Sequence, residues 1–68
     1  MVQERMKSLR LEAKLTQKEI AEKLGISTAF YGQWETGKRN PASKNLQKIA
    51  DFYEVSIDYL LGNTDEKK

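Results

Sequence analysis

The 68-residue sequence contains no cysteine and no histidine, and these two absences remove several classes of protein at once. Without cysteine there is no disulfide bond and no thiolate metal site, and nothing points to an oxidising compartment. Without histidine, the most common general base and the most common zinc ligand are both missing. The sequence also lacks a glycine-rich phosphate loop and paired acids in an enclosed setting. We therefore expect no enzyme, no catalytic residue, no metal and no cofactor.

Long hydrophobic runs are also lacking. The apolar runs stop at two or three residues, which is far too short to cross a membrane. Residues 1–5 show no apolar stretch of the kind that signal peptides contain. We therefore expect a soluble cytoplasmic protein without a membrane partner or an evident small-molecule ligand. A chain of this length forms one domain with a small core.

Charge is nearly balanced overall but unevenly distributed along the chain. Twelve basic and ten acidic residues leave a net charge of +2. Residues 38–48 hold four basic side chains and no acid, whereas residues 51–66 hold five acids and no base. A basic band beside an acidic end suits a molecule that presents one side to a polyanion, although a solvated surface can show the same pattern by chance.

Apolar residues recur every three or four positions through most of the chain, which predicts an all-α, compact five-helix domain. The predicted helices span residues 2–13, 17–24, 28–36, 44–53 and 57–61. Thr16 and Glu19 have the spacing of a capping box at the start of the second helix. The other predicted caps are Ser27, Ser43 and Ser56 at helix starts, and Gly25, Gly37 and Gly62 at helix ends. Residues 1–62 form the predicted domain, and residues 63–68 are a polar tail or the start of a linker.

Residues 17–36 hold the most informative pattern. Two helices that cross at about 90–120° through a short turn need a small residue where they touch, a glycine to turn, and apolar residues at the enclosed corner. The sequence supplies all of these with Ile20, Ala21, Leu24, Gly25, Ile26, Tyr31 and Trp34. The pattern predicts a helix-turn-helix formed by the second and third helices. Such a unit can be purely structural, so a role on DNA depends on the outward-facing residues.

Over residues 5–62 the chain resembles the phage-repressor-like helix-turn-helix regulators of the Cro and CI type, the XRE family. The resemblance rests on TQKEIAEKLGIS at residues 16–27, WETGKRNP at residues 34–41 and VSIDYLLG at residues 55–62. It implies a transcriptional regulator, most simply a repressor, that is dimeric on DNA and binds a palindromic double-stranded operator. The half-sites would then lie about 34–36 Å apart. Such a protein would be bacterial or phage-encoded and nucleoid-associated when bound.

The resemblance places residues 28–36 in the major groove as the recognition helix. Thr28 and Ala29 would offer methyl groups to thymine, and Gln33 would both donate to and accept from adenine. Ala29 and Gln33 share a helix face because they are four residues apart. Phe30 and Gly32 are possible further DNA contacts. In isolation, such residues could simply be solvated.

Phosphate contacts are expected around this helix. Gln17 begins the second helix, where free backbone amides and the helix dipole attract an anion, and the resemblance gives the matching glutamine this role. The loop after the recognition helix and the start of the fourth helix should meet the sugar–phosphate backbone, although a basic loop can also be merely solvated. These residues are Lys38, Arg39, Asn40 and Lys44.

The resemblance also pairs Arg10 with Glu35 in a partly buried ion pair, although the two could be separate surface charges. Desolvation offsets the attraction in such pairs, so the expected role is to fix the first helix against the second and third. Tyr31 stands where the family usually has a branched aliphatic residue, so its hydroxyl needs a partner or must reach the surface. Glu54 stands where glycine or asparagine commonly ends the fourth helix, so we expect that bend to take another form.

Two surfaces remain open to interpretation. Ile57, Tyr59 and Leu61 cannot all face one small core, and they are candidates for a homodimer contact. Phe30 stands where the family more often has a small polar residue, and it could contact DNA, pack locally or bind a partner protein. The alternative function is therefore a protein-interaction module, an antirepressor or antitoxin-like adaptor, that uses Phe30, Tyr59 and the last helix. Salt dependence separates the two functions, because DNA binding weakens steeply with salt.

Overall fold

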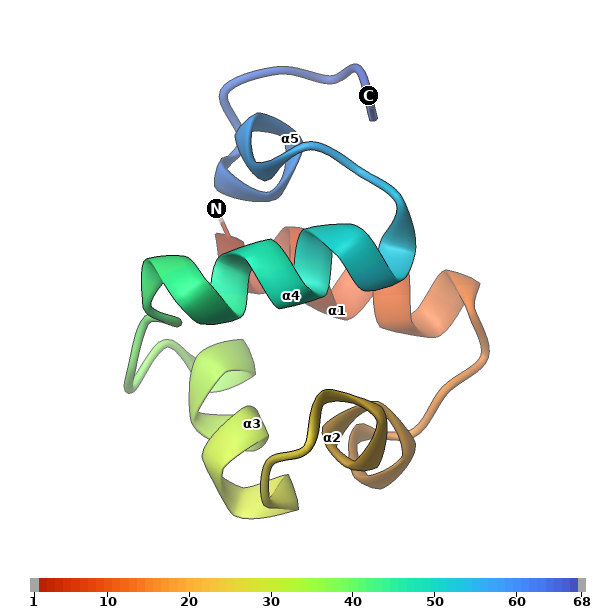
Figure 1. Cartoon of the computed structure of the whole chain (residues 1–68), viewed down its shortest axis with the longest axis vertical. Coiled ribbons are helices and arrows are strands. Elements are labelled where there is room, and N and C mark those ends of the chain that lie inside the picture. The colour runs from red at the N-terminus through yellow and green to blue at the C-terminus, as the bar shows by residue number, and fades with distance from the viewer. Residues whose placement is uncertain (1, 68) are drawn as a thin grey trace.

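A computed structural model describes residues 2–67, which form five helices and confirm the predicted all-α fold. The helices are α1 (Val2–Glu12), α2 (Gln17–Leu24), α3 (Thr28–Thr36), α4 (Ser43–Tyr53) and α5 (Ile57–Leu61). In Figure 1, α1 and α4 run across the middle of the view, with α2 and α3 below them and α5 above. Helix α1 packs against both α3 and α5, α2 packs against α3, and α4 packs against α5. The helix-turn-helix therefore lies at one end of the molecule.

Every helix contributes to a single hydrophobic core. The apolar stripes of the sequence face inward, and each large side chain removed from water contributes about 1.5–3 kcal/mol before the opposing chain entropy is counted. The largest fully buried side chains are Trp34, Tyr31, Met6, Ile20, Ile49 and Leu60. Leu46 and Tyr53 of α4 pack against this core but are only partly buried. The core thus fixes the angle between α2 and α3 from the inside.

The start of α2 and the turn into α3 follow the predicted capping pattern. The hydroxyl oxygen of Thr16 accepts from the amide of Glu19 at 3.1 Å, and the amide of Thr16 donates to the Glu19 carboxylate at 2.8 Å. Gly25 ends α2 with a φ of 76°, a left-handed conformation that favours glycine. Two residues later, the Ser27 hydroxyl accepts from the amide of Phe30 at 3.1 Å and begins α3. These local signals set the short turn of the helix-turn-helix.

The predicted cap at Ser43 is wrong. Ala42 is the N-cap of α4, with an extended backbone and no side-chain cap bond, and its carbonyl accepts from the amide of Leu46 at 2.8 Å. Ser43 is therefore already the first helical residue. A hydroxyl inside the first turn is displaced from the position at which a cap side chain reaches the orphan amides.

Two helix ends differ from the prediction because residues other than glycine take the left-handed conformation. Lys14 has a φ of 58°, so α1 ends before Ala13, which is exposed and not part of the apolar face. Glu54 has a φ of 57°, so the expectation that the bend there takes another form is wrong. In both places the residue that follows the left-handed one is apolar and folds inward: Leu15 is partly buried and Val55 is buried. Burial of that residue offsets the steric cost of the left-handed backbone.

Residues 63–67 turn back toward α1 instead of extending away from it. The amide of Ser56 donates to the carbonyl of Lys67 at 2.6 Å. Arg5 contacts Asp65 at 2.8 Å, and Lys67 contacts Glu12 at 3.4 Å, but three of these four side chains are largely exposed, so the two pairs contribute little to stability. The boundary after residue 62 stays a prediction, since the segment beyond it contacts both α1 and the residue before α5.

Two kinds of feature are missing from the described part of the chain. Within residues 2–67, no helix is both long enough and apolar enough to cross a membrane. The same residues contain no group of three or more acidic, histidine or cysteine side chains that could hold a metal ion.

Candidate nucleic-acid interface

A shallow, open hollow lies between the start of α2 and the outer face of α3. It is lined by Gln17, Ala29, Gly32, Gln33, Thr36 and Lys38. All of these except Thr36 are residues for which the sequence predicts DNA contact. The α3 members lie three or four positions apart, so they share one helix face. The fold therefore brings predicted base-contacting and backbone-contacting residues together on one surface.

Thr36 is the member that sequence reasoning missed. The sequence predicts it only as the last residue of the helix. It lies three positions after Gln33 and four after Gly32, and this spacing is the signal that places it on the same face. Its hydroxyl donates to the carbonyl of Gln33 at 3.3 Å, within the last turn of α3.

The remaining predicted contacts lie outside the hollow. Thr28 is the exposed first residue of α3, and Lys44 is exposed in the first turn of α4. Arg39 and Asn40 are exposed in the loop after α3. The amide of Arg39 donates to the carbonyl of Gln33 at 3.2 Å, which folds the start of this loop onto the end of the helix.

Phe30 packs within its own helix. Its ring meets the buried ring of Trp34 edge to face, with centroids 5.3 Å apart and planes at 61°. Aromatic pairs prefer this geometry. About a third of Phe30 stays accessible, with a relative exposure of 36%. Local packing thus accounts for much of this side chain, and its outer edge remains free to touch a ligand.

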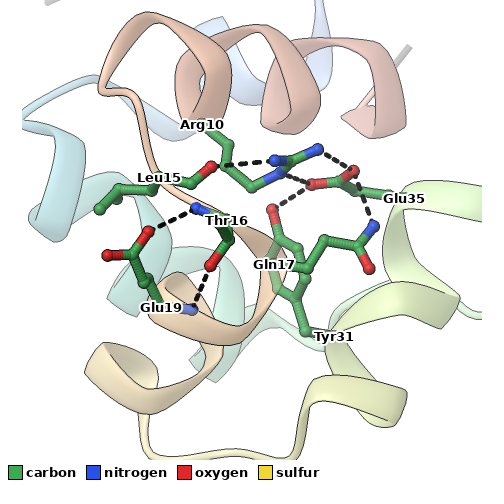
Figure 2. Close-up of polar contacts among 7 residues, drawn as sticks. All are labelled: Arg10, Leu15, Thr16, Gln17, Glu19, Tyr31 and Glu35. Carbon is green, nitrogen blue, oxygen red and sulfur yellow. Dashed lines mark hydrogen bonds and ion pairs between the residues drawn. The ribbon is translucent and has the colours of Figure 1, made fainter.

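The polar centre of the site is the carboxylate of Glu35, which accepts four hydrogen bonds from three residues (Figure 2). Arg10 donates from Nε to Oε2 at 2.7 Å and from Nη2 to Oε1 at 3.1 Å. The hydroxyl of Tyr31 donates to Oε2 at 2.5 Å, and Nε2 of Gln17 donates to Oε1 at 3.2 Å. The partner that the Tyr31 hydroxyl needs is therefore Glu35.

The Arg10–Glu35 ion pair is largely shielded from solvent, with side-chain exposures of 11% and 4%. Burial alone would raise the pKa of Glu35, but hydrogen bonds from Arg10, Tyr31 and Gln17 outweigh it and hold that pKa below its usual value. The hydrogen bond to Glu35 raises the pKa of Arg10. Both groups are therefore charged at neutral pH.

This network joins three helices. Arg10 belongs to α1, Gln17 begins α2, and Tyr31 and Glu35 belong to α3. Arg10 also donates from Nη1 to the carbonyl of Leu15 at 2.9 Å, which ties it to the turn before α2. A carboxamide nitrogen carries two hydrogens, so Gln17 can bind Glu35 with one and still donate with the other. The network thus fixes the side chain of Gln17 at the edge of the hollow.

The three candidates for dimer contact differ in how exposed their side chains are. Ile57 and Tyr59 are partly buried and pack against the core of their own chain. The guanidinium of Arg5 lies 4.1 Å from the centre of the Tyr59 ring, which covers that face of the ring by a cation–π contact. Leu61 is 38% exposed. Of the three, Leu61 is the most exposed.

The comparison with family models agrees with this geometry. A family model described as helix-turn-helix matches residues 6–60, a range that contains α2, α3 and all of the hollow. The chain belongs to this helix-turn-helix family, of the XRE type. Its α2–α3 unit is the helix-turn-helix for which the family is named.

Several relatives of this helix-turn-helix chain bear functional names. The chain is 44% identical to the uncharacterized HTH-type transcriptional regulator YqaE of Bacillus subtilis over 68 residues, which cover 98% of the chain and 59% of YqaE. It is 41% identical to the cryptic phage CTXphi transcriptional repressor RstR of Vibrio cholerae over 69 residues, or 98% of the chain and 62% of RstR. It is 37% identical to the transcriptional activator BcrR of Enterococcus faecalis over 62 residues, or 91% of the chain and 30% of BcrR. The chain thus spans less than two thirds of each of these relatives.

Proposed function

We propose that this helix-turn-helix chain is the DNA-binding part of a transcriptional regulator and that it binds double-stranded DNA sequence-specifically. The observation that carries the proposal is the hollow, which gathers Gln17, Ala29, Gly32, Gln33 and Lys38 on one outward surface. Helix α3 enters the major groove, whose dimensions admit one α-helix.

Base recognition falls to the outward side chains of α3, of which Thr28 and Ala29 are exposed and Gln33 is partly exposed. Gln33 donates to and accepts from adenine, which a carboxamide does with two hydrogen bonds in the plane of the base. The methyl groups of Thr28 and Ala29 pack against thymine methyl groups. Phe30, which is 36% exposed, adds apolar contact to DNA.

Backbone contacts surround this helix. Gln17 donates its remaining N–H to a phosphate at the start of α2, where the helix dipole favours an anion. Lys38 and Arg39 neutralise phosphates after α3, assisted by Asn40 and by Lys44 at the start of α4. The Arg10–Glu35 pair is not part of the contact surface, because its side chains are shielded.

The regulator acts as a homodimeric repressor on a palindromic operator in this proposal. Support for repression comes from RstR, a named repressor that matches over 98% of the chain, whereas the named activator BcrR is less similar. Leu61 on α5 is the centre of the dimer contact because it is the most exposed of the candidates there. Two copies related by a two-fold axis would read half-sites about 34–36 Å apart.

Selection of bound duplexes from a random DNA pool, followed by salt titration, tests the proposal. We expect one palindromic sequence to be enriched and the logarithm of the binding constant to fall linearly with the logarithm of salt concentration. The slope counts the phosphates that are neutralised, at about −0.9 for each. A pool that stays unenriched, with weak binding that is insensitive to salt, would instead favour the protein-interaction module.

A further inference from the structure

Gly32 is the residue of α3 that a helix interior disfavours most. Glycine is the least favourable residue in a helix interior after proline, because it gains no side-chain packing and loses the most conformational freedom. Gly32 lies in the middle of α3, four residues from either end, and it is not among the glycines with a positive φ. Its backbone is one that alanine adopts easily.

The fold does not require a glycine at this position either. A Cβ atom added to Gly32 would meet one neighbour, Oε1 of Gln17, at 3.5 Å, which is ordinary van der Waals contact. Gly37 is different, because its φ of 84° strains any other residue. An alanine at residue 32 is therefore compatible with the free protein and should make α3 more stable.

The missing side chain opens onto the hollow. Gly32 lines the hollow together with Ala29 and Gln33 of its own helix face, and Gln17 and Lys38 belong to the same lining. Gln17 and Lys38 both carry hydrogen-bond donors, so the hollow that they line offers donors to an anion. A methyl group at residue 32 would lie next to Gln17 and take up part of the hollow.

We infer that Gly32 provides clearance for the DNA backbone: a deoxyribose–phosphate unit settles against the bare surface of α3 at Gly32, between Gln17 and Lys38. This inference rests on the proposed function and adds to it a reason for the glycine. Glycine allows a ligand to approach the helix backbone more closely than any other residue does. The phosphate then accepts from the second N–H of Gln17 and from the ammonium group of Lys38. The cost is that glycine makes α3 of the free protein less stable than alanine would.

Substitution of Gly32 by alanine separates stability from binding. We expect Gly32→Ala to raise the melting temperature by about 4–8 °C, the shift that a helix propensity gain of this kind produces in a small domain. DNA affinity should fall about tenfold or more, within the range of a lost phosphate or base contact. The loss should appear both on the duplex selected from the random pool and on a mixed-sequence duplex without that site, because a backbone contact does not depend on sequence.

Ser8→Ala is the matched control, because Ser8 is exposed on α1, outside the hollow, and also gains helix propensity. It should raise the melting temperature slightly and leave DNA affinity unchanged. Unchanged affinity in Gly32→Ala would overturn the inference. A lower melting temperature would overturn it too, since the glycine would then serve the packing of Gln17.

The two remaining outcomes are also decisive. An affinity loss confined to the selected duplex would overturn the inference, because a base edge and not the backbone would then lie over Gly32. Failure of the unsubstituted protein to bind either duplex would overturn the proposed function and this inference with it. If the unsubstituted protein and Gly32→Ala both bind normally, only the inference is overturned.

Discussion

Glu35 shows how one residue can serve the site without facing a ligand. Its carboxylate receives Arg10 from α1, Gln17 from α2 and Tyr31 from its own helix. Each of these donors is itself placed by a different element, so the position of Gln17 depends on α1 and α3 as well as on α2. A side chain that is almost fully shielded from solvent thus sets the orientation of a side chain at the edge of the hollow.

Gln33 is the residue from which a base-specific effect is expected. Gln33→Ala should cost about 1–3 kcal/mol of binding free energy and relax the preference at one base pair in each half-site, because a carboxamide reads adenine through two hydrogen bonds. Binding constants for a panel of single-base operator variants would measure this effect.

Arg39→Ala is the control for that panel. It should weaken binding to all variants alike and reduce the salt slope by about one, as the loss of one phosphate contact does. Equal weakening of every operator by Gln33→Ala would contradict its role in base recognition.

Removal of Arg10 should change how the free energy of unfolding depends on pH. Arg10→Met leaves the Glu35 carboxylate, 4% exposed, without its cation, and should reduce the free energy of unfolding at pH 7 by about 3–5 kcal/mol. In the intact protein the folded-state pKa of Glu35 lies below its usual value of 4.5, so the stabilisation is present above that value and is lost as the pH falls through the lowered pKa. The difference in free energy of unfolding between the intact protein and Arg10→Met should therefore become smaller as the pH falls below about 4.5.

Urea denaturation at several pH values measures this gap, with the fluorescence of the single tryptophan, Trp34, as the probe. Lys67→Ala is a suitable control, because it removes an exposed contact of 3.4 Å to Glu12 and should cost no more than about 1 kcal/mol. A gap that stayed constant from pH 7 to pH 3 would show that Glu35 does not titrate as the structure implies.

At the scale of the helices, the sequence predicts most starts and ends at which one residue provides the signal, and the cap at Ser43 is the exception. The capping box of Thr16 and Glu19 and the turn at Gly25 are where the pattern places them. Lys14 and Glu54 were not recognisable as left-handed residues, because the residues that compensate them, Leu15 and Val55, do so by burial in a core that exists only after folding. Local capping signals can be predicted from a sequence, whereas this compensation depends on tertiary packing.

Lys14 provides a direct test of that compensation. Lys14→Gly should raise the free energy of unfolding by up to about 1–2 kcal/mol, less the entropy that glycine adds to the unfolded chain, because the left-handed backbone no longer crowds a Cβ atom. The midpoint of urea denaturation would report the change.

Lys7→Gly is the matched control, since Lys7 is exposed within α1 and has a helical backbone. There glycine should lower the stability by about 0.5–1 kcal/mol. If both substitutions lowered stability equally, the conformation assigned to Lys14 would be wrong.

At the scale of the whole molecule, the inward residues of the helix-turn-helix predict the fold, and the outward residues predict where the site lies. The spacing of residues such as Ala29 and Gln33 was enough to put them on one face. The meeting of Arg10 with Glu35 could not be derived from spacing, because the two residues are 25 positions apart and on different helices. Nor does any pattern predict the return of residues 63–67 to α1, which depends on one backbone hydrogen bond and two surface ion pairs.

The attachment of Arg10 to Glu35 has a consequence for how the molecule opens. Helix α1 cannot detach alone without leaving a buried carboxylate unpaired, so local fraying of its last turns is coupled to the loosening of α3. Backbone amides near Arg10 and those near Glu35 should therefore exchange with solvent deuterium through one shared opening event, with equal free energies in native-state hydrogen exchange. The five-residue helix α5 should open earlier and separately. Amides near Arg10 that exchanged far faster than those near Glu35 would show that α1 opens independently, and that Gln17 loses its support before the core unfolds.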